Sequence, residues 1–205
     1  VFDLEGTLLE ELFPRWRGEK LRIDCMEFDG QGDLWFSDLR GTAWEPTGGI
    51  YKLTAGSGYR DIELLLGCLA APNGLHHAPC GDVVWAVESS RNSLMRIQLD
   101  KRGAIMKNQF SPMTVYRSHG RPNLDSIQVD QAGNVYVGVM FGGRAVIFDP
   151  DGLPLANILV PGYAEGKLSY TPNLSLRTDR AEGYLVASDR ENAFILRFEA
   201  LAPKC

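Results

Sequence analysis

The sequence has only four cysteines, and none of them is paired as in a metal or redox motif. Cys25, Cys68, Cys80 and Cys205 are far apart, and the chain contains no Cys-x-x-Cys. Zinc ribbons and thioredoxin-like redox sites both use closely spaced cysteines. The spacing excludes these two classes and predicts free thiols.

Long apolar runs and clusters of basic residues are also missing. No apolar stretch approaches the roughly 20 residues that span a bilayer. The 21 Lys and Arg residues are spread along a chain of net charge -5, whereas binding to a phosphate backbone needs concentrated positive charge. We therefore expect a cytoplasmic protein with no nucleic-acid partner and no membrane span. The chain begins at Val1 without a signal-peptide pattern, so we expect the native N-terminus to be missing.

The chain also lacks a long window rich in Ala, Glu, Lys and Leu. Instead it contains 22 Gly and 11 Pro, and 10% of its residues are aromatic. Short strands joined by turns have this composition. The composition predicts an all-β protein, and we expect residues 1–205 to form a single domain.

A repeat of about 50 residues favours a β-propeller over a β-sandwich. Four segments each consist of an apolar strand, a turn with glycine and a strand rich in aromatic and β-branched residues, and each continues into a third strand. A fourth strand is predicted at 63–66 and at 156–160. The predicted turn glycines are Gly32, Gly81, Gly133 and Gly183.

Propellers with blades of this length usually have six or more blades, because a shorter array leaves apolar sheet faces open. We therefore predict a six-bladed propeller of which this chain is an N-terminally truncated fragment of about four blades. Residues 1–20 are expected to end a preceding blade. The four blades are then expected near 22–70, 71–120, 121–170 and 171–205.

Oxygen-bearing side chains recur just ahead of the four predicted inner strands. Asp24, Asn73, Asp125 and Asn173 are separated by 49, 52 and 48 residues. Each alone is typical of a turn that opens a strand. Because the inner strands of a propeller surround one channel, their shared phase indicates a shared site. Carboxylates that converge need a compensating charge, and this all-oxygen set favours calcium or another divalent cation.

Several runs together resemble the senescence marker protein/gluconolactonase family of six-bladed propellers. Two further pairs of segments, 36–41 with 48–51 and 158–162 with 165–166, are similar to the drug-responsive lactonase branch found in staphylococci. The resemblance covers roughly residues 22–198. The runs that carry the family resemblance are 23–29 (IDCMEFD), 72–75 (PNGL), 124–130 (LDSIQVD) and 133–137 (GNVYV).

This resemblance implies a calcium-dependent hydrolase that opens a small-molecule lactone. The family's metal ligands correspond to Asp24, Asn73, Asp125 and Ser126, and Asp125 would also transfer the proton. The family uses a further glutamate from the first blade, which this chain does not contain, so we expect the isolated chain to be inactive. Two alternatives stay open: a non-catalytic interaction platform of the NHL or WD type, and a strictosidine-synthase-like or phosphotriesterase-like enzyme.

Other polar residues are interpreted as structural. His76, His77 and Cys80 resemble a metal cluster, but we expect them in an exposed hairpin turn. His119 is expected in a loop without a catalytic role. The segment 149–152 (DPDG) lacks the remaining ligands of an EF-hand and is predicted to be a turn. Structural roles are also favoured for residues that could otherwise shape a substrate pocket, namely Glu88, Phe141 and Glu165.

Overall fold

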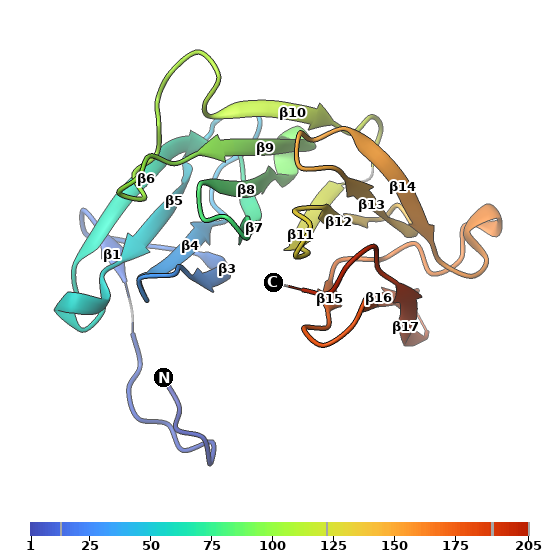
Figure 1. Cartoon of the computed structure of the whole chain (residues 1–205), viewed down its shortest axis with the longest axis horizontal. Helices are drawn as coiled ribbons and strands as arrows, with labels where there is room; N and C mark the ends of the chain where they lie inside the picture. Colours follow the sequence, from blue (N-terminus) through green and yellow to red (C-terminus); the bar gives the residue numbers. More distant parts are fainter. Residues whose placement is uncertain (13, 122, 190, 205) are drawn as a thin grey trace.

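The computed structural model describes residues 1–12, 14–121, 123–189 and 191–204. It is an all-β structure in which four antiparallel meanders are arranged as an open arc (Figure 1). The first three sheets have four strands each, in the orders β3-β4-β5-β6, β7-β8-β9-β10 and β11-β12-β13-β14, and the last has three, β15-β16-β17. The described part of the chain therefore has propeller-like blades, as predicted.

The sheets radiate from a common centre, around which their first strands lie (Figure 1). The first sheet contains β3 (Ile23–Phe28), β4 (Leu34–Asp38), β5 (Gly48–Leu53) and β6 (Ile62–Leu69). The second contains β7 (Pro72–His77), β8 (Val83–Glu88), β9 (Ser93–Gln98) and β10 (Met113–Arg117). The third contains β11 (Asn123–Val129), β12 (Val135–Met140), β13 (Arg144–Phe148) and β14 (Pro154–Leu159). The fourth contains β15 (Leu174–Leu176), β16 (Glu182–Ser188) and β17 (Ala193–Glu199).

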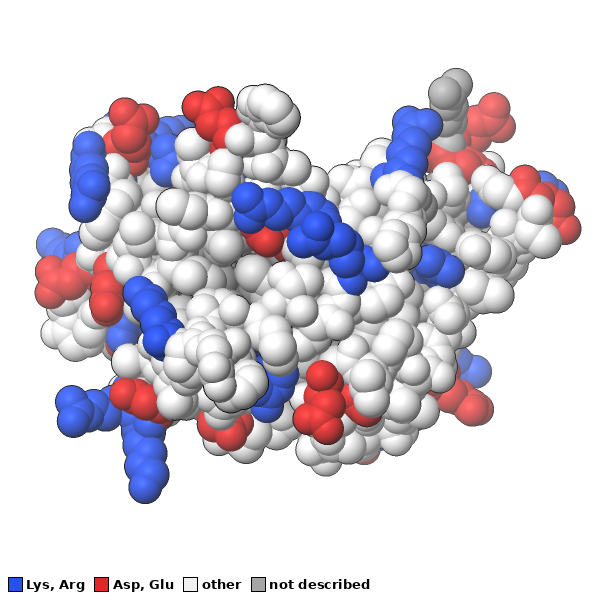
Figure 2. All heavy atoms as spheres, turned by 90° about the horizontal axis from the view of Figure 1, so that it is seen from above, with Lys and Arg blue, Asp and Glu red and all other residues white. Residues whose placement is uncertain are grey.

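Short elements complete the chain. A small hairpin, β1 (Arg15–Trp16) and β2 (Glu19–Lys20), precedes the first sheet. Three 3-10 turns, η1 (Ala55–Ser57), η2 (Ser89–Arg91) and η3 (Tyr163–Glu165), lie in connections between strands. Within the described residues, no helix is long and apolar enough to cross a membrane. Both signs of charge occur across the face shown in Figure 2, so neither sign dominates it.

The predicted strands are confirmed, and β10 is an additional strand that the sequence pattern did not indicate. The predicted fourth strands at 63–66 and 156–160 are β6 and β14. Gly183, however, was wrongly predicted to be a turn residue, because it lies inside β16. An added Cβ there would overlap the ring of Phe198, so close packing on β17 accounts for this glycine.

A recurring Asp-x-x-Gly turn explains why many of these strands end where they do. In each case one Asp carboxylate oxygen accepts hydrogen bonds from the amides two and four residues later, and the glycine has a positive φ. The side chain replaces backbone partners that a tight turn leaves unpaired. These turns begin at Asp3, Asp29, Asp100, Asp130 and Asp149. The segment 149–152 is thus a turn, as predicted.

The hydrophobic core lies between neighbouring sheets. One cluster joins the first two sheets through Trp35, Leu75 and Ile97, all at most 1% exposed. A second joins the second and third sheets through Trp85, Ile127 and Phe148, and a third lies between the last two sheets. Each blade therefore depends on its neighbours for burial of its apolar faces.

Candidate functional site

The same irregularity occurs at the start of three inner strands. In β3, Ile23 pairs with Asp38 and the next pair is Met26 with Phe36. The ladders of β7 and β11 skip in the same way. A bulge of this kind sets two residues against one and re-aims their side chains. The bulged residues are Asp24 and Cys25 in β3, Asn73 and Gly74 in β7, and Asp125 and Ser126 in β11.

The bulges bring predicted site residues from different blades together. Asn73 Nδ2 donates a hydrogen bond to Asp125 Oδ1 at 2.5 Å. The close approach of β7 and β11 requires Gly74, because an added Cβ would lie 2.5 Å from the carbonyl oxygen of Asp125. Asp24 lies near enough for its charge to act on Asp125.

The electrostatics of this cluster are those of two neighbouring carboxyls whose ionisation is disfavoured. Burial and the negative charge of Asp24 raise the pKa of Asp125 to about 6, while the hydrogen bond from Asn73 opposes this rise. Partial burial also raises the pKa of Asp24, against the influence of Arg22. Burial and like charge both favour the neutral acid. The pair is thus poised to take up either protons or a positive ion.

Ser126 completes the group with a hydroxyl that lacks a partner. Its Oγ is buried and makes no hydrogen bond among the described residues, and buried polar atoms of this kind are uncommon. Gly138, the residue opposite the bulge, is close enough that an added Cβ would approach Ser126 Oγ to 3.3 Å. Within the described part of the chain, Ser126 Oγ is therefore an unpaired buried oxygen on the residue that follows Asp125.

Asn173, the fourth polar residue of the repeat, differs from the other three. It is exposed and precedes β15 without a bulge being recorded in that strand. Its carbonyl oxygen accepts a hydrogen bond from the amide of Val186. The structure therefore gives Asn173 a backbone role, and the side chains that interact in the cluster are those of Asp24, Asn73 and Asp125.

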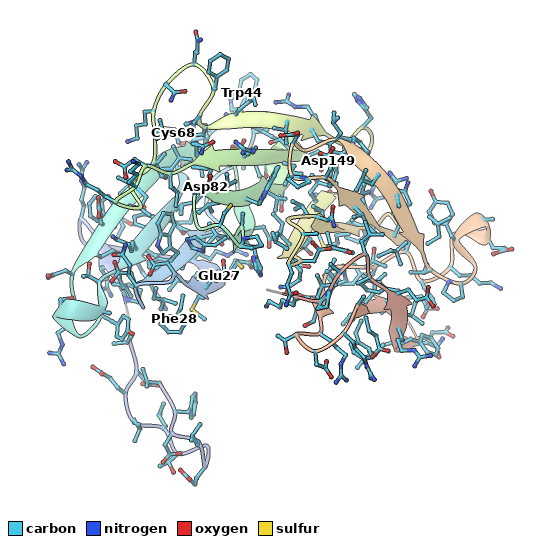
Figure 3. All side chains as sticks on the ribbon, in the orientation of Figure 1. Glu27, Phe28, Trp44, Cys68, Asp82 and Asp149 are labelled. Carbon is cyan, nitrogen blue, oxygen red and sulfur yellow. The ribbon has the colours of Figure 1, made fainter. Side chains whose placement is uncertain are left out.

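A second polar cluster lies further along the same inner strands, and it corrects one sequence interpretation. His76 and His77 were wrongly expected in an exposed turn. They belong to β7, and the side chain of His76 is 7% exposed. Glu27 of β3 accepts hydrogen bonds from the amide N of His77 at 2.7 Å and from its Nδ1 at 3.0 Å. Figure 3 shows Glu27 on the inner part of the arc.

In this second cluster Glu27 and the Nδ1 atom of each histidine are paired, whereas the buried Nε2 atoms of His76 and His77 have no hydrogen-bond partner among the described residues. His76 Nδ1 lies 2.8 Å from the carbonyl oxygen of His77 and 3.3 Å from Glu27 Oε1. Burial lowers the pKa of His76, although the charge of Glu27 opposes this effect. Cys80 is exposed in the following turn, so it does not join the histidines. Among the described residues, no three His, Cys, Asp or Glu side chains group as they would around a metal ion.

The remaining candidates are placed as follows. Glu88 is 3% exposed and accepts hydrogen bonds from the Ala70 amide and the Arg91 guanidinium, which confirms its structural role. His119 is exposed in a loop, as expected. Glu165 lies in η3 and is exposed. Cys25, Cys68 and Cys80 are free thiols, as predicted, while Cys205 lies outside the described residues.

Comparison with known proteins agrees with this architecture. Residues 1–166 match the model of the SMP-30/gluconolactonase/LRE-like region. Lactonase drp35 of Staphylococcus haemolyticus is 31% identical over 166 residues, which are 81% of this chain and 50% of that protein. The drp35 lactonase of Staphylococcus aureus strain USA300 is 32% identical over 71% of this chain and 44% of its own length. The chain thus spans about half the length of the curated relatives it matches.

Two solved structures have the same fold. A gluconolactonase from Xanthomonas campestris superposes with a TM-score of 0.70 at 18% identity, covering 91% of this chain and 61% of that one. The calcium-binding protein regucalcin from Agrobacterium tumefaciens gives a TM-score of 0.67 at 21% identity, covering 87% and 64%. At these identities the likeness shows the fold alone.

Proposed function

Because the chain belongs to the SMP-30/gluconolactonase/LRE-like family, we propose that the complete protein is a calcium-dependent hydrolase that opens the ring of a small lactone. The observation that carries this proposal is the meeting of Asp24, Asn73 and Asp125 from three blades at one end of the inner strands. The lactonases to which this chain is similar support a lactone as the class of substrate.

The donor set fits a hard divalent cation. Asp24, Asp125 and Ser126 offer oxygen atoms, and the amide of Asn73 can turn its oxygen toward an ion. Calcium takes six to eight such ligands, including carboxylates, amide carbonyls and water. A dication would compensate the two carboxyls that otherwise favour protonation, and would give the buried Ser126 Oγ a partner. The calcium-binding regucalcin with the same fold is compatible with this assignment.

In this mechanism Asp125 carries the proton. A bound cation supplies electrostatic stabilisation for the negative charge that develops on the lactone carbonyl oxygen. Asn73 holds Asp125 Oδ1, so that Oδ2 remains to accept a proton from the attacking water and to return it to the leaving ring oxygen. Beside a bound dication the Asp125 carboxylate would be held ionised, so it could accept this proton. Asp24 and Ser126 act as ligands.

We further propose that the complete protein is a closed six-bladed propeller. The residue that follows each bulge packs against the preceding blade: Leu75 and Ile127 are 1% and 2% exposed, but their counterpart Met26 is 60% exposed. Phe28 is also 60% exposed, and Figure 3 shows it at the open side of the arc. An additional blade would cover this face. We expect the first blade of the complete protein to contribute the remaining glutamate ligand, so that the isolated chain is inactive.

Lactone hydrolysis by the complete protein tests the proposal. Asp125→Asn should lower calcium-dependent kcat/KM at least about 100-fold, because both a ligand and the proton acceptor are lost. Asp151→Asn is the matched control, since Asp151 is exposed and its side chain makes no recorded hydrogen bond in the described part of the chain. Wild-type turnover in Asp125→Asn would refute the mechanism, and calcium binding without turnover of any lactone would favour the interaction platform.

A further inference from the structure

Two aromatic rings and a guanidinium gather near the leading end of β11. The rings of Phe141 and Tyr170 meet edge to face with centroids 5.3 Å apart. The guanidinium carbon of Arg121 lies 5.9 Å from the centroid of Phe141. The three come from separate segments, before β11, directly after β12 and before β15. Phe141 and Tyr170 nevertheless remain 45% and 39% exposed, so the cluster presents an open aromatic surface.

This cluster is joined to the proposed catalytic residues through the backbone. The segment 169–172, which carries Tyr170, is fixed at one end to the turn that carries Phe141 and at the other end to Ser126. The bonds join the Gly143 amide to the Ser169 carbonyl (2.9 Å), Thr171 Oγ1 to the Val139 carbonyl (2.6 Å) and the Ser126 amide to the Pro172 carbonyl (3.3 Å). The aromatic surface therefore has a fixed position relative to Asp125 and Ser126.

The backbone of Phe141 is also unusual. Its φ is +64°, which a bulky residue rarely adopts because its Cβ crowds the backbone. Strain of this kind persists where the surroundings impose it, and it concentrates at functional sites. Gly142 and Gly143 follow directly, so a glycine was available for this conformation within one residue. Six other non-glycine residues among those described also have a positive φ, so it is the contact of the Phe141 ring with Tyr170 that sets this residue apart.

We propose that Phe141 and Tyr170, steadied by Arg121, form a substrate-binding wall that determines which lactones enter the site. This inference rests on the lactonase function proposed above. Rigid aromatic faces bury a flat apolar group well, whereas hydroxyl groups placed against them lose hydrogen bonds to water. The wall therefore favours lactones with a flat apolar substituent over polyhydroxylated ones.

Three lactones of the same ring size test the wall in the complete protein: benzo-fused, unfused and polyhydroxylated. Phe141→Leu and Tyr170→Leu should each raise KM for the benzo-fused lactone about three- to tenfold. kcat, and KM for the other two, should change less than about twofold. Tyr170→Phe keeps the ring and should retain the wild-type KM. Trp44→Leu is the matched control, because Trp44 is 96% exposed and lies at the outer rim in Figure 3.

The outcomes separate this inference from the proposed function. Equal changes in KM for all three lactones in Phe141→Leu and Tyr170→Leu, or an unchanged KM for the benzo-fused one, would contradict the proposed binding wall. Neither result would contradict the lactonase function. If the wild type opens no lactone, ligand-observed NMR binding of the benzo-fused lactone still decides. Loss of its saturation transfer in Tyr170→Leu, with retention in Tyr170→Phe and Trp44→Leu, supports the wall, and unchanged transfer in Tyr170→Leu contradicts it.

Discussion

Two polar clusters lie three residues apart along the same inner strands: Glu27 with His76 and His77, and Asp24 with Asn73 and Asp125. They differ in how the charges of their carboxylates are paired. Glu27 receives hydrogen bonds from the amide and ring of His77. Asp125 instead shares its surroundings with another carboxyl, and Ser126 Oγ nearby lacks a partner. The carboxylate of Glu27 is thus paired within the protein, although the buried Nε2 atoms of His76 and His77 have no partner among the described residues. Asp24 and Asp125 instead act on each other as like charges, and this is the cluster that we propose binds a cation, although its residues individually resemble ordinary turn formers.

Of the variants that distinguish the two clusters, Gly74→Ala is expected to have the largest effect on lactonase activity. The new Cβ would lie 2.5 Å from the Asp125 carbonyl oxygen and 2.7 Å from the Ile127 amide nitrogen. β7 and β11 must then separate, so we expect at least about 100-fold loss of lactonase kcat/KM and destabilisation of about 1–3 kcal/mol. Gly30→Ala is the control, since nothing lies within 4 Å of its added Cβ. Equal activity in the two variants would show that the approach of β7 to β11 is irrelevant to the site.

Removing the charge of Glu27 should lower the stability of the folded protein without changing its affinity for calcium. Glu27→Gln weakens charge-assisted hydrogen bonds to His77, and we expect a loss of about 1–3 kcal/mol in the free energy of unfolding, measured by urea denaturation. Calcium affinity should stay within about twofold of wild type. If Glu27→Gln lowers calcium affinity as much as Asp125→Asn does, then Glu27 belongs to the calcium site and the two clusters are not separate.

The sequence predicts the strands well, because apolar alternation and the Asp-x-x-Gly turns are local signals. It misses β10, whose five residues are mostly exposed or half-buried and follow a long irregular connection. The bulges could not be predicted from the sequence either, because the register of a strand depends on the neighbouring strand. The burial of His76 and His77 could not be predicted because their partner, Glu27, lies about 50 residues away in sequence.

The two clusters should respond to pH in opposite directions in calcium-free buffer. The folded pKa of Asp125, about 6, exceeds its ordinary 3.8, so this group contributes stability that is full below 3.8 and is lost as pH rises toward 6. The folded pKa of His76 is below its ordinary 6.5, so its contribution is full above 6.5 and is lost as pH falls.

Denaturation midpoints measured from pH 4 to 8 would separate these contributions. Asp125→Asn should remove the part of the slope due to Asp125, and His76→Gln the part due to His76. Each change is expected to be smaller than the effect of Gly74→Ala. An unchanged pH profile in Asp125→Asn would mean that this carboxyl is not desolvated in the folded protein.

Calorimetric titration of the complete protein with calcium tests most directly the claim that Asp24, Asn73 and Asp125 surround one ion. Wild type and Glu27→Gln should bind one calcium ion in this site with similar affinity, whereas Asp125→Asn should bind it at least about tenfold more weakly. Equal affinity in wild type and Asp125→Asn would contradict the account.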